Sequence, residues 1–335
     1  MNIKERVIAT FEHRQPDKTP YAVGFTVPAY EKMVEYYGDA NFASQFECCL
    51  TGVPTGLKGG WEEVRPDIWR DAYGVEWDRS IDKDIGVVAN RLVTPENVED
   101  YVFPEIETRE WFDEHYGETV RKNPDAFYVA DLGFSLFERA WTLAGMENIL
   151  MSMAADPDFV HRLLDRILEH NLQIIENWCR YDVDAAYFGD DWGQQTGVMM
   201  GAEMWREYIK PRIKEMYGLV KSHGKYVTIH SCGKVDEIFP DLIEAGLDMF
   251  NPFQPEVMDV FEMKKLYGDR LTFHGGISTQ RTLPYGTPEE TKDEVRRLIK
   301  EIGKNGGYIA APAHAIPGDA KAENIAAMFE VLANQ

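Results

Sequence analysis

Residues 226–250, YVTIHSCGKVDEIFPDLIEAGLDMF, contain one complete strand–helix–strand unit. The unit opens with the β-rich run 226–230 and continues as an amphipathic segment over 234–245. Gly246 ends that segment, because glycine readily adopts the left-handed conformation found just after a helix. A second apolar run, 247–250, follows at once. This order predicts a βα unit whose two strands lie parallel in one sheet.

The same alternation of short β-rich runs and longer amphipathic stretches continues from about residue 125 to the end of the chain. Further strands are predicted at residues 127–132, 185–189, 271–274 and 307–311. Asp156 followed by Pro157 predicts the start of a long helix, because an N-cap followed by proline favours helix initiation. Thr287 with Glu290 forms the pattern of a capping box and predicts a second helix that continues to Ile302.

The first third of the chain is less regular. Residues 21–25 read as a first strand, and 41–56 contain a weaker candidate for a second. Residues 61–92 read as an inserted hairpin with Gly74 near its turn. The candidate strands at 21–25 and within 41–56, together with the six later ones, make eight. This number favours an α/β fold with a closed (β/α)8 TIM barrel over an open sheet. No linker divides residues 1–335, so we expect one domain with N-terminal helical and hairpin additions.

The charge balance excludes several kinds of partner. The chain has 57 acidic and 35 basic residues, a formal net charge of −22, and this field repels nucleic acid and anionic membranes. No apolar run reaches the ~18 residues of a spanning helix. The N-terminus resembles no signal peptide and the four cysteines form no disulfide pattern. We therefore expect a cytoplasmic protein without nucleic-acid or membrane partners. Homodimer formation is consistent with the sequence.

The sharpest local motif is HSCG, where the strand 226–230 ends. Residues two apart in a strand face the same side, so His230 and Cys232 can present an imidazole and a thiolate together, which is half of a zinc site. His314, in the loop after the last strand, is the natural third ligand because strand-to-helix loops of a barrel converge on one face. His274 ends another strand on that face. The alternative is a buried histidine and a buried free cysteine.

Other polar side chains fall at comparable positions after the predicted strands. We expect catalytic roles for Asp191, Glu138 and Gln195, and substrate contacts for Asp190, Gln254 and His274. Recurrence after consecutive strands favours function, although a solvated loop explains either aspartate taken alone. Glu138 lies in an apolar stretch, where a carboxylate needs a partner or a role. An ion pair with Arg139 is its alternative.

Several ordered motifs together resemble the uroporphyrinogen-decarboxylase-like superfamily, and the resemblance spans nearly the whole chain. They are RVIATFEHRQPDKTP (6–20), GDDWGQQTG (189–197), EMWREYIKPRIKEM (203–216), HSCGKVDEIFPDLIEAGLDMFNPFQPE (230–256), FHGGISTQRTLPYGTPEE (273–290) and GGYIAAPAHAI (306–316). We expect each to lie at a strand-to-helix junction. The resemblance implies a TIM barrel with its site on the strand-to-helix loops.

The true decarboxylases of that superfamily are metal-free, and two of their motifs are missing from this sequence. They hold a carboxylate-rich tetrapyrrole with an arginine-rich R-Q-A-G-R motif and an aspartate in an F-S-D-I type motif. Here the corresponding regions read GFTVPAYEKM (24–33) and QFECCLTGV (45–53). The resemblance therefore implies that uroporphyrinogen is not the substrate, since an acidic chain without a cationic clamp binds polycarboxylates poorly.

The other branch resembles this chain more closely. It contains zinc-dependent methyltransferases that act with methylcorrinoid proteins, including methylcobamide:coenzyme M methyltransferases, whose ligands are an H-x-C pair and a cysteine in a P-G-C-G type loop. His230 and Cys232 match the pair, and His314 replaces the loop cysteine. The resemblance implies Zn2+, a corrinoid (methylcobalamin) on a partner protein, and a small methyl donor or acceptor. A lyase acting on a tetrapyrrole or small carboxylate, and a non-catalytic corrinoid- or tetrapyrrole-binding protein, stay open.

Overall fold

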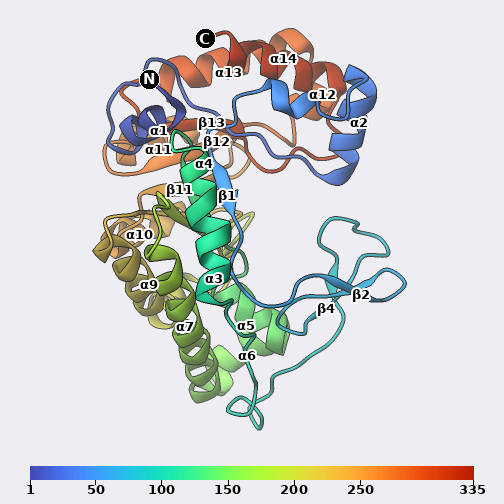
Figure 1. The fold of residues 1–335 in the computed structure, drawn as a ribbon, viewed down its shortest axis with the longest axis vertical. Helices are drawn as coiled ribbons and strands as arrows, with labels where there is room; N and C mark the ends of the chain where they lie inside the picture. Colours follow the sequence, from blue (N-terminus) through green and yellow to red (C-terminus); the bar gives the residue numbers. More distant parts are fainter.

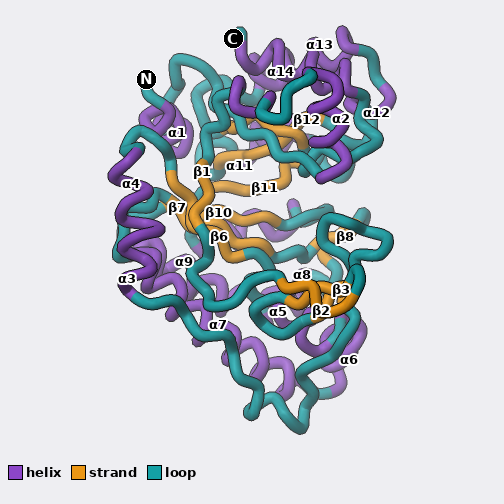
Figure 2. The backbone as a smooth tube through the Cα atoms, turned by 45° about the vertical axis from the view of Figure 1, so that its right-hand side comes forward, coloured by secondary structure: helices purple, strands orange, loops and turns teal.

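The computed structural model describes residues 1–335, and its centre is a parallel sheet of seven strands. In spatial order these are β1 (Thr51–Val53), β6 (Tyr128–Leu132), β7 (Ala185–Gly189), β10 (Tyr226–His230), β11 (Met249–Phe253), β12 (Thr272–Ile277) and β13 (Tyr308–Pro312). The strands of this sheet, drawn in orange, run through the middle of the molecule, with purple helices outside them (Figure 2). The predicted α/β TIM-barrel class is confirmed.

The eighth position of the barrel is filled by the segment that we predicted as a first strand, residues 21–25. This segment forms two isolated parallel bridges, Tyr21 to Ala310 and Phe25 to Ile316, rather than a continuous strand. On its other side the N–H of Cys49 donates to the carbonyl of Tyr21 at 2.9 Å. The prediction of eight full strands is therefore corrected: seven strands and one irregular segment close the barrel.

Helices cover the outside of the barrel, and additional helices flank its N-terminal part (Figure 1). The N-terminal helices are α1 (Ile3–Phe11), α2 (Val27–Tyr37), α3 (Arg109–Phe112) and α4 (Thr119–Lys122), with a 3-10 turn at Phe42–Gln45 and a π-helical turn at Asp113–Glu118. The others are α5 (Phe137–Ala144), α6 (Met146–Ala155), α7 (Pro157–Cys179), α8 (Ala202–Tyr208), α9 (Lys210–Ser222), α10 (Phe239–Ala245), α11 (Val260–Tyr267), α12 (Thr282–Tyr285), α13 (Pro288–Glu301) and α14 (Ala322–Ala333), with a 3-10 turn at Asp236–Ile238. None combines the length and apolar composition that crossing a bilayer requires.

The local signals at the helix ends have the predicted effect. The Asp156 side chain accepts the N–H of Phe159 at the start of α7. Thr287 and Glu290 form a reciprocal capping box at α13. Gly246 ends α10 with φ of 104°. The strand predicted over 247–250 instead runs over Met249–Phe253. The prediction ended too early because the buried continuation of the strand contains an asparagine and a proline, which are usually loop residues.

The inserted region over 61–92 contains more strands than the predicted hairpin. It forms an antiparallel sheet of four strands: β2 (Glu62–Arg65), β3 (Ile68–Arg70), β4 (Glu76–Asp78) and β5 (Val87–Val88). Gly74, with φ of 83°, lies in the turn between β3 and β4 as predicted. The insert projects to one side of the barrel in Figure 1, while its Trp77 is buried in the main apolar core.

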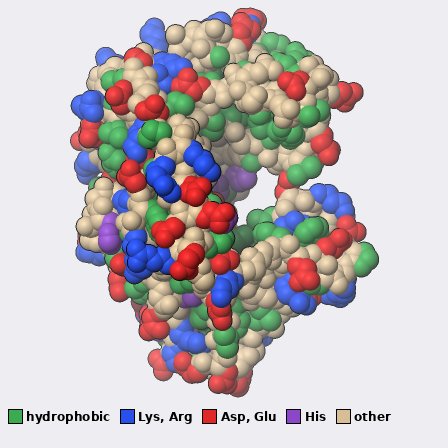
Figure 3. Space-filling model, in the orientation of Figure 1, with side chains coloured by type: hydrophobic (Ala, Val, Ile, Leu, Met, Phe, Trp, Pro, Cys, Tyr) green, Lys and Arg blue, Asp and Glu red, His purple; other side chains and the backbone are tan.

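The insert and α2 lie on opposite sides of a deep hollow, and histidine side chains are visible at its base (Figure 3). A hydrogen bond joins them, in which the N–H of Val27 at the start of α2 donates to Asp84 Oδ1 at 2.9 Å. A carboxylate at a helix N-terminus is favoured by the helix dipole. This contact therefore links the two walls of the hollow.

Candidate functional site

A cavity of about 500 Å³ opens at the C-terminal ends of the barrel strands. All seven strands and the closing segment contribute to its wall, which is the usual position of an active site in this fold. The lining residues are Ala22, Val23, Gly24, Cys48, Leu50, Gly52, Val129, Asp131, Tyr187, His230, Asn251, His274, Ala311, Pro312, His314 and Ala315.

The cavity exists because one side of the barrel is lined by very small residues. TIM-barrel interiors are usually filled by bulky branched side chains. Here Ala22, Gly24, Gly52 and Ala311 occupy neighbouring inward positions on the closing segment, β1 and β13. A Cβ atom added to Gly52 would meet no other atom within 4 Å. The small residues therefore leave room for a ligand along one wall.

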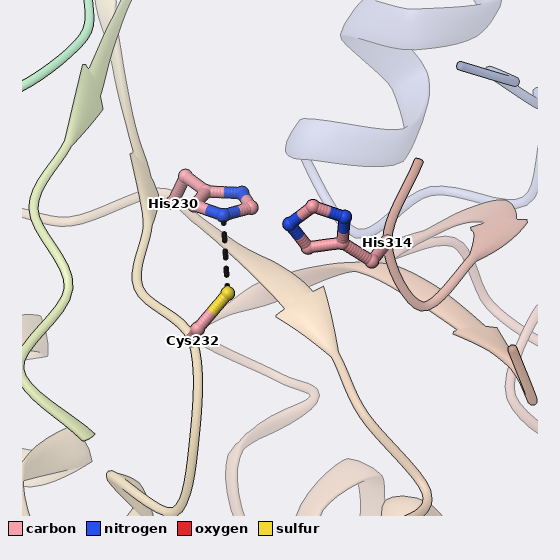
Figure 4. Close-up of side chains that lie close together, drawn as sticks. All are labelled: His230, Cys232 and His314. Atoms are coloured by element: carbon pink, nitrogen blue, oxygen red, sulfur yellow. Dashed lines mark hydrogen bonds between the residues drawn. The ribbon is translucent and has the colours of Figure 1, made fainter. Parts of the chain in front are cut away.

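The three predicted metal ligands meet at this cavity. One donor atom each from His230, Cys232 and His314 lies within 4.8 Å of the others. The His230 Nε2 atom is 3.3 Å from Cys232 Sγ, and the His314 ring faces both (Figure 4). His230 ends β10, Cys232 lies in the loop after it, and His314 follows β13, as predicted. Two imidazoles and a thiol are a donor set that suits zinc.

The orientation of the His230 ring is fixed by a hydrogen-bond chain. Asn251 Nδ2 donates to the carbonyl of His274 at 3.0 Å, which turns its Oδ1 atom toward His230. That oxygen accepts the His230 Nδ1–H at 2.6 Å and the Tyr187 hydroxyl at 3.0 Å. The proton of a neutral ring then lies on Nδ1, and the lone pair on Nε2 faces Cys232. Metal-binding histidines typically donate their other ring N–H to an oxygen in this way, which fixes the ring orientation.

The loop that carries Cys232 is held by two other predicted site residues. Asp191 Oδ1 accepts the N–H of Cys232 at 2.7 Å, and Gln254 Oε1 accepts the N–H of Gly233 at 2.8 Å. Burial and the nearby Asp191 carboxylate raise the pKa of the Cys232 thiol, so it stays protonated unless a cation compensates the thiolate. Asp191 and Gln254 therefore position the loop, and neither is among the residues lining the cavity.

Asp190 lies inside the protein rather than at the cavity. It is fully buried, and its carboxylate accepts the N–H groups of Phe137 and Glu138 at the start of α5 and the Trp192 indole N–H at 2.7 Å. A third N–H, that of Leu136, lies at 3.4 Å. With its oxygens occupied by protein donors, Asp190 caps α5, and the structure offers no path to the expected substrate contact.

Glu138 and Gln195, the other predicted catalytic residues, occupy different environments. Glu138 is 9% exposed in the first turn of α5, and burial followed by the Asp191 carboxylate raises its pKa. Its alternative partner Arg139 pairs with Asp71 instead, at 3.2 Å. Gln195 is exposed in the turn between β8 (Gly193–Gln194) and β9 (Gly197–Val198), away from the cavity lining.

The structure adds lining residues that the sequence reasoning missed. Asp131 near the end of β6, Tyr187 of β7 and Asn251 of β11 all line the cavity beside His230. Burial raises the pKa of Asp131 to about 6. Asp131 could have been found from the sequence, because it is the one carboxylate in the otherwise apolar strand FYVADL. Glu138 was selected for the same reason, as a carboxylate in an apolar stretch. The predicted residue His274 also lines the cavity, and burial followed by His230 lowers its pKa to about 4.

Comparison with known proteins gives a family match. The model of the family described as "Uroporphyrinogen decarboxylase (URO-D)" matches residues 71–335. The uroporphyrinogen decarboxylase of Chlorobaculum tepidum is 24% identical over 213 residues, 59% of this chain and 58% of that protein. A methylated-thiol–coenzyme M methyltransferase of Methanosarcina mazei is 22% identical over 163 residues, 49% of this chain and 42% of that protein. The chain thus spans less than two thirds of these curated relatives.

A solved structure matches over a longer range than the sequences do. A methyltransferase from Methanosarcina mazei superimposes with a TM-score of 0.72, covering 100% of this chain and 99% of the other. The two sequences are 17% identical. At that identity the match supports the fold, and the chemistry depends on the residues at the cavity.

Proposed function

This chain belongs to the uroporphyrinogen decarboxylase (URO-D) family, and within it we propose a zinc-dependent methyltransferase that moves a methyl group between a corrinoid protein and a small molecule. The observation that carries the proposal is the convergence of one donor atom each from His230, Cys232 and His314 within 4.8 Å. A catalytic zinc site commonly has three protein ligands and one further position for water or substrate. The names of relatives in both branches are consistent with an enzyme.

The residues present fit a zinc ion. The Nε2 lone pair of His230 is directed toward Cys232 by Asn251, and burial with the neighbouring His230 lowers the pKa of His314, which keeps that imidazole neutral. Bound there, zinc would supply a Lewis acid that activates a thiol or similar methyl acceptor. Asp191 holds the loop of Cys232, and Glu138, with its raised pKa, can carry a proton at neutral pH.

Decarboxylation of a polycarboxylate is the alternative that the related decarboxylases favour. The cavity gives it little support, because none of its lining residues is a lysine or an arginine. Carboxylates of a substrate are normally held by cationic, often bidentate, side chains. The one charged carboxyl group in the wall, that of Asp131, would repel them.

Metal content is the first test of the proposal. We expect protein purified without added metal to contain close to one zinc per chain, and Cys232→Ser to lose most of it. Cys48→Ser is the matched control, because Cys48 lines the same cavity without belonging to the donor cluster. Its zinc content should match the wild type.

Methyl transfer is the second test. We expect zinc-loaded wild-type protein to move methyl groups between methylcobalamin and a thiol probe, and Cys232→Ser to lose this activity. Zinc content that is unchanged by Cys232→Ser would contradict the proposed site. Coproporphyrinogen formed from uroporphyrinogen at enzymatic turnover would contradict the proposed reaction.

A further inference from the structure

The cavity contains a second pair of polar residues outside the donor cluster. Asp131 belongs to β6 and His274 to β12. When the closing segment 21–25 is counted with the seven strands, four positions separate β6 from β12 in either direction around the barrel. The two side chains therefore approach the cavity from opposite walls, with His230 of β10 midway between them.

The carboxylate of Asp131 has no hydrogen-bond or ion-pair partner in the protein, and the Thr55 hydroxyl donates to the main-chain oxygen of this residue at 2.8 Å. It is exposed to the open cavity, and the surrounding barrel wall raises its pKa to about 6. At neutral pH it is mostly ionised, and a carboxylate in such a wall can be paired by a cationic side chain. No lysine or arginine lines the cavity to do so.

His274 supplies a neutral polar group on the other wall. Burial lowers its pKa to about 4, so it carries no positive charge that could pair with Asp131. Its Nδ1 atom is buried without a hydrogen-bond partner. That atom is closed off from the cavity, whereas other parts of the half-buried His274 side chain line it.

The remaining wall sets the shape of what can bind. Gly24, Gly52 and Ala311 leave an apolar space beside Asp131, and a Cβ atom at Gly52 would still meet nothing within 4 Å. A compact apolar group fits such a surface, whereas a second charged group would find no counterpart there.

We propose that Asp131 and His274 form a substrate subsite for a small molecule that has a compact apolar body and one hydrogen-bond-donating group, either an ammonium or a hydroxyl. Asp131 accepts the donor, the small-residue wall receives the apolar body, and anions are excluded. The subsite rests on the proposed function only in taking this molecule as the methyl donor or acceptor. His230, midway between the two walls, would place the reacting group near the donor cluster.

Three matched probes test the subsite by calorimetric titration: benzylammonium, benzyl alcohol and phenylacetate. We expect the wild type to bind at least one of the first two more tightly than phenylacetate. Asp131→Leu should weaken that binding at least about tenfold, because a charge-assisted hydrogen bond is lost. Asp131→Asn keeps the size and an acceptor oxygen, so it should weaken benzylammonium at least about tenfold and benzyl alcohol by about threefold or less. This difference identifies which donor the site prefers.

Asp269→Asn is the control, because Asp269 precedes β12 at the opposite end of the barrel and its side chain is 78% exposed. It should leave all three affinities unchanged. Phenylacetate binding as tightly as the donor probes, no measurable binding of either donor probe, or unchanged affinities in Asp131→Leu would each overturn the subsite. Zinc content and methyl transfer are measured on the same samples. Loss of those readouts with intact probe binding would refute the proposed function and leave the subsite standing.

Discussion

The Nδ1 atom of His230 lies 2.6 Å from Oδ1 of Asn251, and this contact decides which nitrogen of the ring can bind a metal. The amide of Asn251 cannot turn over without losing the hydrogen bond from its Nδ2 to the carbonyl of His274. The ring proton is therefore held on Nδ1. The nitrogen that faces Cys232 and the cavity carries the lone pair.

Removing this contact should weaken metal binding without removing a ligand. We expect Asn251→Ala to lower zinc affinity about 10- to 100-fold, because the hydrogen-bond acceptors that orient metal-bound histidines typically contribute that much. Asn251→Asp should restore most of the affinity, since a carboxylate also accepts from Nδ1–H. Competition with a chromogenic chelator measures both. Tyr187→Phe, which removes the other donor to the same oxygen, should have a smaller effect. Equal affinities in Asn251→Ala and the wild type would contradict the assignment.

Asp190 should matter for stability before it matters for chemistry. Asp190→Ala leaves the N–H groups at the start of α5 and the Trp192 indole without their buried acceptor. We expect the free energy of unfolding to fall by about 3 kcal/mol, since each buried unsatisfied group costs roughly 1–3 kcal/mol. Denaturant unfolding measures the change. Gln195→Ala, at an exposed turn, should change stability by less than about 0.5 kcal/mol. Similar values for the two variants would contradict the capping role.

A larger side chain in the cavity wall should block ligand binding without lowering the stability of the fold. Gly52 has room for a side chain, so Gly52→Val should keep a wild-type melting temperature and zinc content but lose binding of the benzyl probes. Gly189 is a useful contrast, because its Cβ would lie 3.2 Å from the Cα of Gly133. Gly189→Val should lower the melting temperature. Unchanged probe binding in Gly52→Val would place the ligand elsewhere.

The affinity for an ammonium ligand should depend on the ionisation of Asp131. Burial raises this pKa to about 6, and the nearby His230 lowers it in part. The Tyr187 and Tyr116 hydroxyls near Asp131 stay protonated because burial raises their pKa values. Above pH 6 the carboxylate is charged, and below it the charge-assisted bond is lost. In chelator-treated protein, benzylammonium affinity should therefore fall as the pH drops from 7.5 to 5. A flat profile in Asp131→Asn is expected, and a flat wild-type profile would contradict the prediction.

The sequence could predict the metal candidates because their signals are short in range. Alternation along the strand 226–230 places His230 and Cys232 on one side, and barrel topology brings the loop of His314 to the same rim. Both inferences need only the local pattern and the fold class. The structure brings the three side chains together, and zinc binding by them stays a prediction.

The roles of Asp190 and Asp191 could not be read in this way. The two residues are adjacent in the sequence and follow the same strand, yet Asp190 is fully buried beneath α5 while Asp191 holds the loop of Cys232. The difference depends on which N–H groups lie nearby, and apart from the Trp192 indole these belong to residues about 40 to 50 positions away in the chain. Sequence spacing contains no information about such partners.

By itself, the sequence determined the barrel and most of its strands and helix ends, and it indicated the three candidate donor residues, because hydrophobic period, capping residues and strand alternation act over a few neighbouring positions. Only the tertiary structure decided that an irregular segment closes the barrel at residues 21–25. It also decided that small residues leave a cavity in the barrel, and that Asp131 faces this cavity, which no lysine or arginine side chain lines. These properties depend on which side chains meet across the barrel, and that pairing of distant residues is set by closure of the sheet.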